Sequence, residues 1–312
     1  MVSVDLFAGI GGWSLASARI SGPKLIGAEI DPDVVRTRSA AHLLTIRTNL
    51  LTYPPPQISL DLLCASPPCQ SFSSQGTRTG ITSIPALCED ISARRWDISK
   101  YDYLTATILV VGKWITTTTP AAIALEQVQT VQPIWHVLAN LLSTLGYSTW
   151  TGVLNAADYG VPQTRKRALL LASRNHEVYQ PRPTHAKTPN PARGILPWIP
   201  MSQALAGTGA IYTPEQSWVQ DRPATTVIGD RRIWPPGRKH SAWDVEKYGP
   251  NPPKTLSDRK GTHAIRLKPS QALLLQSFPE DYPVYGYKRE TYNQIGNAIP
   301  PKLASAALQA VL

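Results

Sequence analysis

Short apolar runs recur through the first half of the chain, and stretches with helical spacing of apolar residues separate them. The runs predict strands over residues 2–7, 24–29, 61–65, 122–126, 150–154 and 168–172. Prolines at first helical positions predict helices over residues 33–42, 132–145, 270–277 and 303–312, and another helix begins near Trp13. Strands that alternate with helices are typical of an open α/β sheet covered by helices on both faces.

Residues 173–262 differ in composition from the rest of the chain. They hold 13 of the 29 prolines and four of the nine tryptophans, and they lack long helical periodicity. Because the tryptophans and apolar runs can form a small core, we interpret them as a smaller irregular, β-rich domain rather than a disordered insert. The predicted organisation is a sheet domain over 1–172, this second domain over 173–262, and a hinge with a C-terminal helix over 263–312 that returns to the first domain.

The chain carries 31 Lys and Arg against 21 Asp and Glu, a formal net charge of +10. This balance favours a polyanionic partner, although a solvated basic face gives the same composition. The three cysteines form no CxxC pair, which argues against a disulfide framework and against a metal site. Since no leader pattern and no apolar run of about 18 residues occurs, we expect a soluble cytoplasmic protein without membrane contact.

A glycine-rich turn follows the first predicted strand, in the segment 5–12 that contains Gly9 and Gly11. Glycines at this place let the backbone approach a ligand at the carboxyl end of a strand. Glu29 ends the second strand about 20 residues later, where a carboxylate can accept hydrogen bonds from ribose hydroxyls. The third glycine of the GxGxxG pattern is missing, which disfavours a dehydrogenase, and the segment predicts a different ribose-bearing cofactor.

Cys69 follows the third predicted strand, directly after Pro67 and Pro68. Two prolines fix the backbone and remove two N–H donors, and such rigidity suits a nucleophile that must hold one attack geometry. The alternative for any free cysteine is a buried structural role, and we adopt it for Cys64 and Cys88.

Glu126 ends the next strand, so we expect it at the same sheet edge as Cys69. A carboxyl group in a closed pocket can act as a proton donor. Arg165 and Arg167 alternate in an extended segment, so both side chains point the same way and can address one ligand. A solvated basic loop is the alternative. The positive charge of these arginines favours a thiolate at Cys69.

In this order, these segments resemble the cytosine-5 DNA methyltransferase family along nearly the whole chain. The matching segments are 5–12, Glu29, 67–70, Glu126, 163–167, 270–279 and 294–300. The resemblance implies a Rossmann-like S-adenosylmethionine-dependent methyltransferase sheet in a catalytic, cofactor-binding domain. It also implies that residues 173–262 are a target recognition domain.

The resemblance further implies a mechanism. Cys69 adds to carbon 6 of a cytosine that has been flipped out of the duplex, and carbon 5 then takes a methyl group from S-adenosyl-L-methionine. Glu126 donates to N3 of the ring, while Arg165 and Arg167 address O2 and nearby phosphate. No metal is required.

Binding residues carry over on the same basis. The implied cofactor pocket is lined by Phe7, Gly9, Gly11, Glu29, Ile30, Asn49, Leu50, Pro68, Asn297 and Ile299. The implied DNA contacts are Gln70, Ser73, Arg78 and Gln163. Residues 71–100 are expected to form a mobile loop that closes over DNA and contains Gly76 and Gly80. The expected base-reading turns are 225–227 and 255–256.

Two positions depart from the family pattern. Asn49 stands where an aspartate usually accepts from the adenine amino group, and an amide oxygen predicts weaker binding. Gln127 replaces the asparagine that usually follows the catalytic glutamate. Its extra methylene either slows the enzyme or shifts a hydrogen bond.

Two other interpretations remain open. RNA cytosine-5 methylation uses the same cysteine in a related branch, but the large basic segment 173–262 favours DNA. A non-catalytic DNA-binding homologue is expected to lose Cys69 or Glu126, and both are present. The expected partner is double-stranded DNA. We also expect a monomer in the cytoplasm of a bacterium or a phage-infected cell. The sequence leaves open whether a cognate restriction endonuclease accompanies it.

Overall fold

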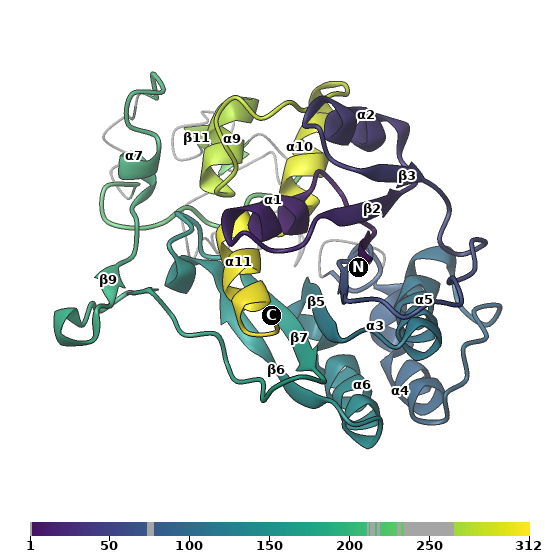
Figure 1. Cartoon of the computed structure of the whole chain (residues 1–312). Helices are drawn as coiled ribbons and strands as arrows, with labels where there is room; N and C mark the ends of the chain where they lie inside the picture. The colour runs from purple at the N-terminus through teal and green to yellow at the C-terminus, as the bar shows by residue number, and fades with distance from the viewer. Residues whose placement is uncertain are drawn as a thin grey trace, which may run out of the picture.

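A seven-stranded sheet forms the centre of the molecule, which is described by a computed structural model (Figure 1). The structure describes residues 2–73, 78–210, 212, 216, 219–229, 232–233 and 265–312. The strands are β1 (Ser3–Leu6), β2 (Leu25–Glu29), β3 (Thr45–Arg47), β4 (Leu62–Ala65), β5 (Ala122–Val128), β6 (Ser148–Asn155) and β7 (Lys166–Ser173). Their order is β3-β2-β1-β4-β5-β7-β6, and β7 alone runs antiparallel to the other six strands.

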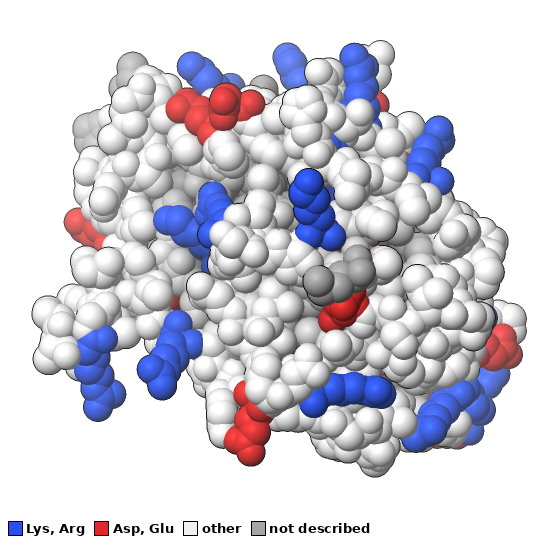
Figure 2. Space-filling view, in the orientation of Figure 1, with Lys and Arg blue, Asp and Glu red and all other residues white. Residues whose placement is uncertain are grey.

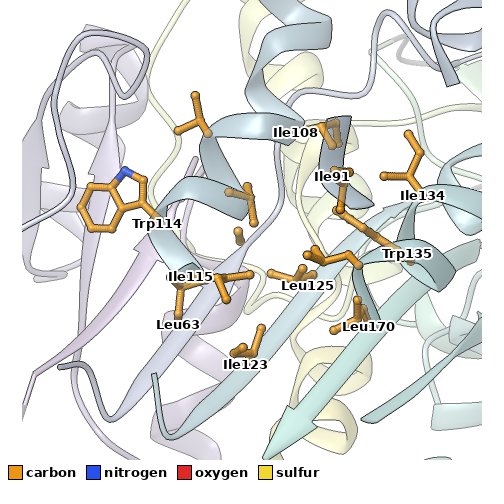
Figure 3. Close-up of a cluster of buried hydrophobic side chains, with 14 of the residues drawn as sticks. Leu63, Ile91, Ile108, Trp114, Ile115, Ile123, Leu125, Ile134, Trp135 and Leu170 are labelled. Atoms are coloured by element: carbon orange, nitrogen blue, oxygen red, sulfur yellow. The ribbon is translucent and has the colours of Figure 1, made fainter. Parts of the chain in front are cut away.

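Helices cover both faces of this sheet because successive strand residues point to opposite sides. On one face, α4 (Ile84–Ser92), α5 (Tyr103–Thr118) and α6 (Gln132–Thr144) pack against alternate strand residues such as Leu63, Ile123 and Leu125 (Figure 3). On the other face, the first and last helices, α1 (Gly12–Arg19) and α11 (Pro301–Gln309), lie side by side (Figure 1). The two ends of the chain thus build one layer together.

The predicted fold class is confirmed, and so are the six predicted strands. Each observed strand overlaps its prediction to within three residues at either end. Pro32 begins α2 (Pro32–Ala40), and the Asp31 side chain caps it by accepting from the backbone N–H of Asp33 at 2.8 Å. The edge strand β3 was not predicted, because three residues with an exposed Ile46 leave no alternating apolar pattern.

The described residues between β7 and Arg266 form short elements, which include β8 (His185–Ala186), β9 (Leu196–Pro197), α7 (Met201–Ala204), β10 (Arg232–Ile233) and β11 (Ile265–Arg266). Two helices of the returning segment follow, α9 (Pro269–Leu275) and α10 (Lys288–Asn297). A separate apolar cluster joins Met201, Leu205 and Val227 to these helices. The proposed boundaries of the recognition domain remain a prediction, and the predicted turn 255–256 lies outside the described residues.

The predicted mobile loop over 71–100 is partly helical. Residues in this range form α3 (Thr79–Thr82) and α4, and the α4 side chains Leu87 and Ile91 are buried against the sheet. Their i, i+4 spacing gives the helix an apolar face, which anchors it. Gly76 lies outside the described residues, and Gly80 lies in α3 with the Phe72 ring beside it.

Among the helices of the described residues, none has both the length and the apolar character that a bilayer crossing requires.

Candidate active site

The carboxyl ends of β1, β2, β4 and β5 meet at one edge of the sheet, next to the point where the strand order reverses between β1 and β4. Ligands of open α/β sheets bind at this kind of edge. Two cavities meet here: a smaller pocket of 380 Å³ and a larger cleft of 1830 Å³. Cys69, Gln70 and Asn297 line both of them, so the thiol lies where the two cavities join.

The glycine-rich turn forms the floor of the smaller pocket, and its backbone has an unusual conformation. Gly9 and Gly11 have φ of 48° and 99°, and Phe7 also has a positive φ, of 56°. A Cβ on Gly12 would lie 2.2 Å from the carbonyl oxygen of Ile299, so only glycine permits the turn to contact the C-terminal segment. The turn therefore depends on a close contact between the two ends of the chain.

Glu29 is fixed against this turn by three backbone N–H groups. Oε2 accepts from Gly9 at 2.9 Å, and Oε1 accepts from Ile30 at 2.8 Å and from Asp31 at 3.1 Å. A carboxylate held by three donors keeps a single orientation, and it has a further lone pair for a ligand hydroxyl. The strand-end acid is thus preorganised beside the glycine turn.

Most of the predicted cofactor residues line the smaller pocket. They are Phe7, Gly9, Glu29, Ile30, Asn49, Leu50, Pro68, Asn297 and Ile299. Gly11 is not among the lining residues, because it caps α1 with its Cα facing Leu43: a Cβ there would lie 2.3 Å from Leu43 Cδ1. Gly12 lines the pocket in its place.

Sequence reasoning missed the wall of this pocket that α5 supplies, with Tyr103, Leu104 and Thr107. A signal for this helix does exist. Asp102 caps α5 by accepting from the backbone N–H of Leu104 and Thr105, directly before a long apolar run. The capping residue and the run together could have predicted both the helix and the pocket wall.

Asp5 belongs to the glycine-turn motif, but it does not line the smaller pocket. It is fully buried in β1, and neither carboxyl oxygen has a hydrogen-bond partner among the described residues. Burial raises the pKa of Asp5 to about 8, although nearby Arg38 opposes the shift. Burial thus favours the protonated form of Asp5, which packs under the turn.

The Cys69 thiol is half-buried at the end of a short turn. The carbonyl oxygen of Cys69 accepts from the backbone N–H of Phe72 at 3.0 Å and of Ser73 at 2.9 Å. Burial raises the pKa of the thiol. The charges of Arg167 and Arg165 lower it, but Glu126 adds to the increase. The expectation that the arginines favour the thiolate is thus right in sign, but burial outweighs them.

Glu126 and Arg167 form an ion pair beside this thiol. Nε of Arg167 lies 2.9 Å from Oε1 of Glu126, and the two side chains are 12% and 5% exposed. The Glu126 side chain makes no other hydrogen bond to a described residue, so one of its oxygens can meet a ligand. The strand-end acid predicted from the sequence therefore lies in the same pocket as Cys69.

Arg165 has different partners from Arg167, so the expectation that both arginines address one ligand is only partly met. Its guanidinium donates to the carbonyl oxygens of Val227 at 3.2 Å, Gly296 at 2.8 Å and Ala298 at 3.1 Å. Burial, followed by the charge of Arg167, lowers its pKa. Its Nε has no partner among the described residues, and Arg165 lines the pocket, so this N–H is left to donate to a ligand.

The larger cleft is strongly basic. Its described lining includes the cations Lys166, Arg167, Arg266, Lys268, Lys288 and Arg289, and Asp31 is the one acid among these lining residues. On the face shown in Figure 2, Lys and Arg side chains are also more widely spread than Asp and Glu. The cleft therefore suits a polyanion.

Of the four predicted DNA contacts, two line the cleft and two do not. Gln70 and Ser73 line the cleft. Arg78 is exposed next to α3 and does not line it. Gln163 is fully buried, and its amide bonds to Leu275, Gln276 and Val227, so the expectation of a DNA contact at Gln163 is not supported.

Within the ranges that the structure describes, no three His, Cys, Asp or Glu side chains gather in a way that could hold a metal ion.

Solved structures share this fold over the whole chain. The structure of a Spodoptera frugiperda DNMT2 mutant covers 99% of both chains with a TM-score of 0.65 and 15% identity. The Entamoeba histolytica methyltransferase EhMeth covers 99% of this chain and 97% of its own, with a TM-score of 0.62 and 14% identity. The sheet order and these matches show a Rossmann-like α/β fold.

The family follows from the sequence comparison. The profile of the C-5 cytosine-specific DNA methylase family matches residues 1–312, and the chain belongs to this family. The Type II methyltransferase M1.HphI of Haemophilus parahaemolyticus is 28% identical over 99% of this chain and 86% of its own. M.HindV of Haemophilus influenzae is 26% identical over 100% of this chain and 96% of its own. The resemblance identified from the motifs is thus confirmed.

Proposed function

We propose that this chain methylates carbon 5 of cytosine in double-stranded DNA, with S-adenosyl-L-methionine as the methyl donor and Cys69 as a covalent nucleophile. The observation that carries the proposal is the position of Cys69 at the junction of a ribose-type pocket and a basic cleft, with Glu126 beside it. A thiol in this place can reach one ligand from each cavity.

The smaller pocket fits the proposed donor. Glu29 is fixed for ribose hydroxyls, and a Cβ built on Gly9 meets no atom within 4 Å, so the turn leaves room for a ligand. Oδ1 of Asn49 accepts from the backbone N–H of Leu51 at 3.1 Å, and its second lone pair can accept from an adenine amino group. Phe7 and Ile30 supply apolar surface for the adenine ring.

In the proposed reaction, each of four side chains has a separate role. The Cys69 thiolate adds to carbon 6 of cytosine, and the electron pair of the ring double bond moves to carbon 5. Glu126 donates a proton to N3, which neutralises the charge that the addition creates. Arg167 holds the Glu126 side chain, and the free Nε of Arg165 donates to O2. When bound, the donor supplies a methyl group on positively charged sulfur, which carbon 5 accepts. Water takes the carbon 5 proton, and the electron pair of that C–H bond restores the double bond and expels the Cys69 thiolate. N3 then returns its proton to Glu126.

A cytosine must leave the helix stack to enter this site. Glu126 is only 4% exposed, and the half-buried Cys69 lies where the cleft joins the smaller pocket. A stacked base cannot meet both groups, and extrusion of one base costs a few kcal/mol, on the order of what phosphate contacts recover. We therefore infer base flipping, with the duplex held in the cleft.

Lys288 and Arg289, in the first turn of α10, are proposed phosphate contacts. Both are exposed, both line the cleft, and neither forms an ion pair with a described residue. For Lys288→Ala with Arg289→Ala, we expect the slope of log K against log salt to become shallower by about 2, or roughly 0.9 for each lost phosphate contact. Fluorescence anisotropy with labelled duplex over a salt series measures this slope.

A matched control removes two exposed cations outside the cleft, Lys113 on α5 and Arg94 at the end of α4. This control should keep the wild-type slope. If the Lys288 and Arg289 variant also keeps it, the two residues contact no phosphate.

Base-resolution mapping of methylcytosine tests the proposed function directly. DNA from a cell that expresses the chain should carry 5-methylcytosine in one fixed sequence, and the Cys69→Ala strain should not. Transfer RNA from the same cells should remain unchanged. An unmethylated genome with methylated RNA would assign the chain to RNA instead.

The Type II names of its relatives lead us to propose a cognate restriction endonuclease.

A further inference from the structure

The turn before Cys69 exposes carbonyl groups but lacks N–H donors at its two prolines. Nε2 of Gln127 donates to the carbonyl oxygen of Pro67 at 2.8 Å and to that of Pro68 at 3.2 Å. Oε1 of Gln127 accepts from the backbone N–H of Val128 at 2.5 Å. The side chain is 1% exposed, so both ends of its amide are fixed without competition from water.

The residues after Cys69 are also held by a hydrogen bond, which comes from the segment that follows β5. Oγ1 of Thr130, in the 3₁₀ turn η1 (Gln129–Val131), donates to the carbonyl oxygen of Phe72 at 2.7 Å. The Phe72 ring is fully buried, which fixes the other side of that residue. The side chains of Gln127 and Thr130 therefore form hydrogen bonds to the backbone on both sides of Cys69.

We propose that Gln127 and Thr130 are positioning residues that keep the Cys69 thiol in register with Glu126. This inference rests on the proposed function. Glu126 precedes Gln127 on β5, so a shift of the turn against this strand end changes the separation of the thiol and the acid. Misplacement of reacting groups by 1 Å costs on the order of a hundredfold in rate, and each of these hydrogen bonds opposes such a shift.

The same geometry gives the departure at Gln127 a physical meaning. Its amide spans from the end of β5 to both proline carbonyls and also bonds to its own strand. An asparagine is shorter by one methylene, so its amide would not keep these distances from the same backbone position. The glutamine is thus matched to the double-proline turn of this chain, and we expect Gln127→Asn to slow the reaction.

Single-turnover methyl transfer at saturating duplex tests the proposal. Thr130→Val keeps the side-chain shape and removes the donor, and Gln127→Met keeps the length and removes the amide. We expect each variant to lower the rate about tenfold, which corresponds to roughly 1.4 kcal/mol. Because neither bond is made to a ligand, the KM for DNA should stay within about twofold of wild type.

Two further variants separate positioning from general damage. Thr130→Ser keeps the hydroxyl and should recover most of the wild-type rate. Thr144→Val removes a comparable hydroxyl that donates at 2.7 Å to the carbonyl oxygen of Leu141 within α6, and it should have no effect. All rates are measured below the unfolding transition of each variant, as followed by circular dichroism.

The outcomes distinguish the two proposals. A wild-type chain that forms no methylcytosine overturns the proposed function itself. A wild-type chain that is active while Thr130→Val and Gln127→Met keep its rate overturns the positioning role alone. A rise in KM without a fall in rate, or a loss that Thr130→Ser does not recover, also overturns it.

Discussion

Cys69→Ser is expected to abolish the covalent adduct that the wild-type chain forms with a 5-fluorocytosine duplex in the presence of S-adenosyl-L-methionine. Fluorine replaces the proton that must leave carbon 5, so the wild-type adduct persists. A serine hydroxyl is not ionised near neutral pH and is a much weaker nucleophile than a thiolate. On ordinary cytosine, we expect methyl transfer to fall by at least about a thousandfold, roughly 4 kcal/mol of transition-state stabilisation.

Denaturing electrophoresis and mass spectrometry detect this adduct. Cys88→Ser is the matched control, because Cys88 is half-buried on α4 and lines neither cavity. It should form the adduct at the wild-type level. Should Cys69→Ser still attach to the duplex, another residue is the nucleophile.

The pH dependence of adduct formation follows from the environment of Cys69. Burial, together with Glu126, raises the pKa of the thiol above its ordinary value, and the two arginines only partly offset this shift. The thiolate is therefore the minor form at neutral pH. We expect the rate to rise by about tenfold per pH unit from roughly pH 6 until the thiol pKa is reached. A rate that is flat over this range would falsify the raised thiol pKa.

Glu126→Gln is expected to lower the single-turnover rate by about 10² to 10³, or roughly 3 to 4 kcal/mol. The amide cannot donate an acidic proton to N3, and the mostly buried Arg167 then faces a neutral amide instead of the carboxylate that proton transfer leaves. Affinity for the methyl donor, measured by calorimetry, should change little because Glu29 and the glycine turn still hold the ribose site.

Glu280→Gln makes the same chemical change on an exposed acid outside both cavities and should leave the rate unaltered. Rapid-quench assays with a radiolabelled methyl donor measure the rates of both variants. A Glu126→Gln enzyme that keeps the wild-type rate at saturating DNA would show that Glu126 is not the proton donor.

The candidate site residues at strand ends could be predicted because a local pattern, the apolar run directly before each of them, marks their place in the sheet. Gly9, Glu29, Cys69 and Glu126 each follow an apolar run, and parallel strands bring their carboxyl ends to one edge. Short or irregular elements could not be predicted in this way. The strand β3 has no alternating pattern, and Gln163 lies in a basic motif that is typical of the surface, yet it is buried against α9.

The amino-acid sequence by itself determined the fold class and the family, and it led to the proposal of Cys69 and Glu126 as reacting side chains, since periodicity and motif order carry that information along the chain. Only the tertiary structure decided which groups support them. Gln127, Thr130 and Arg165 act through bonds to residues about 60 to 130 positions away, and no local pattern encodes such partners. The raised pKa of Cys69 was likewise decided by burial, which depends on the packing of the whole domain.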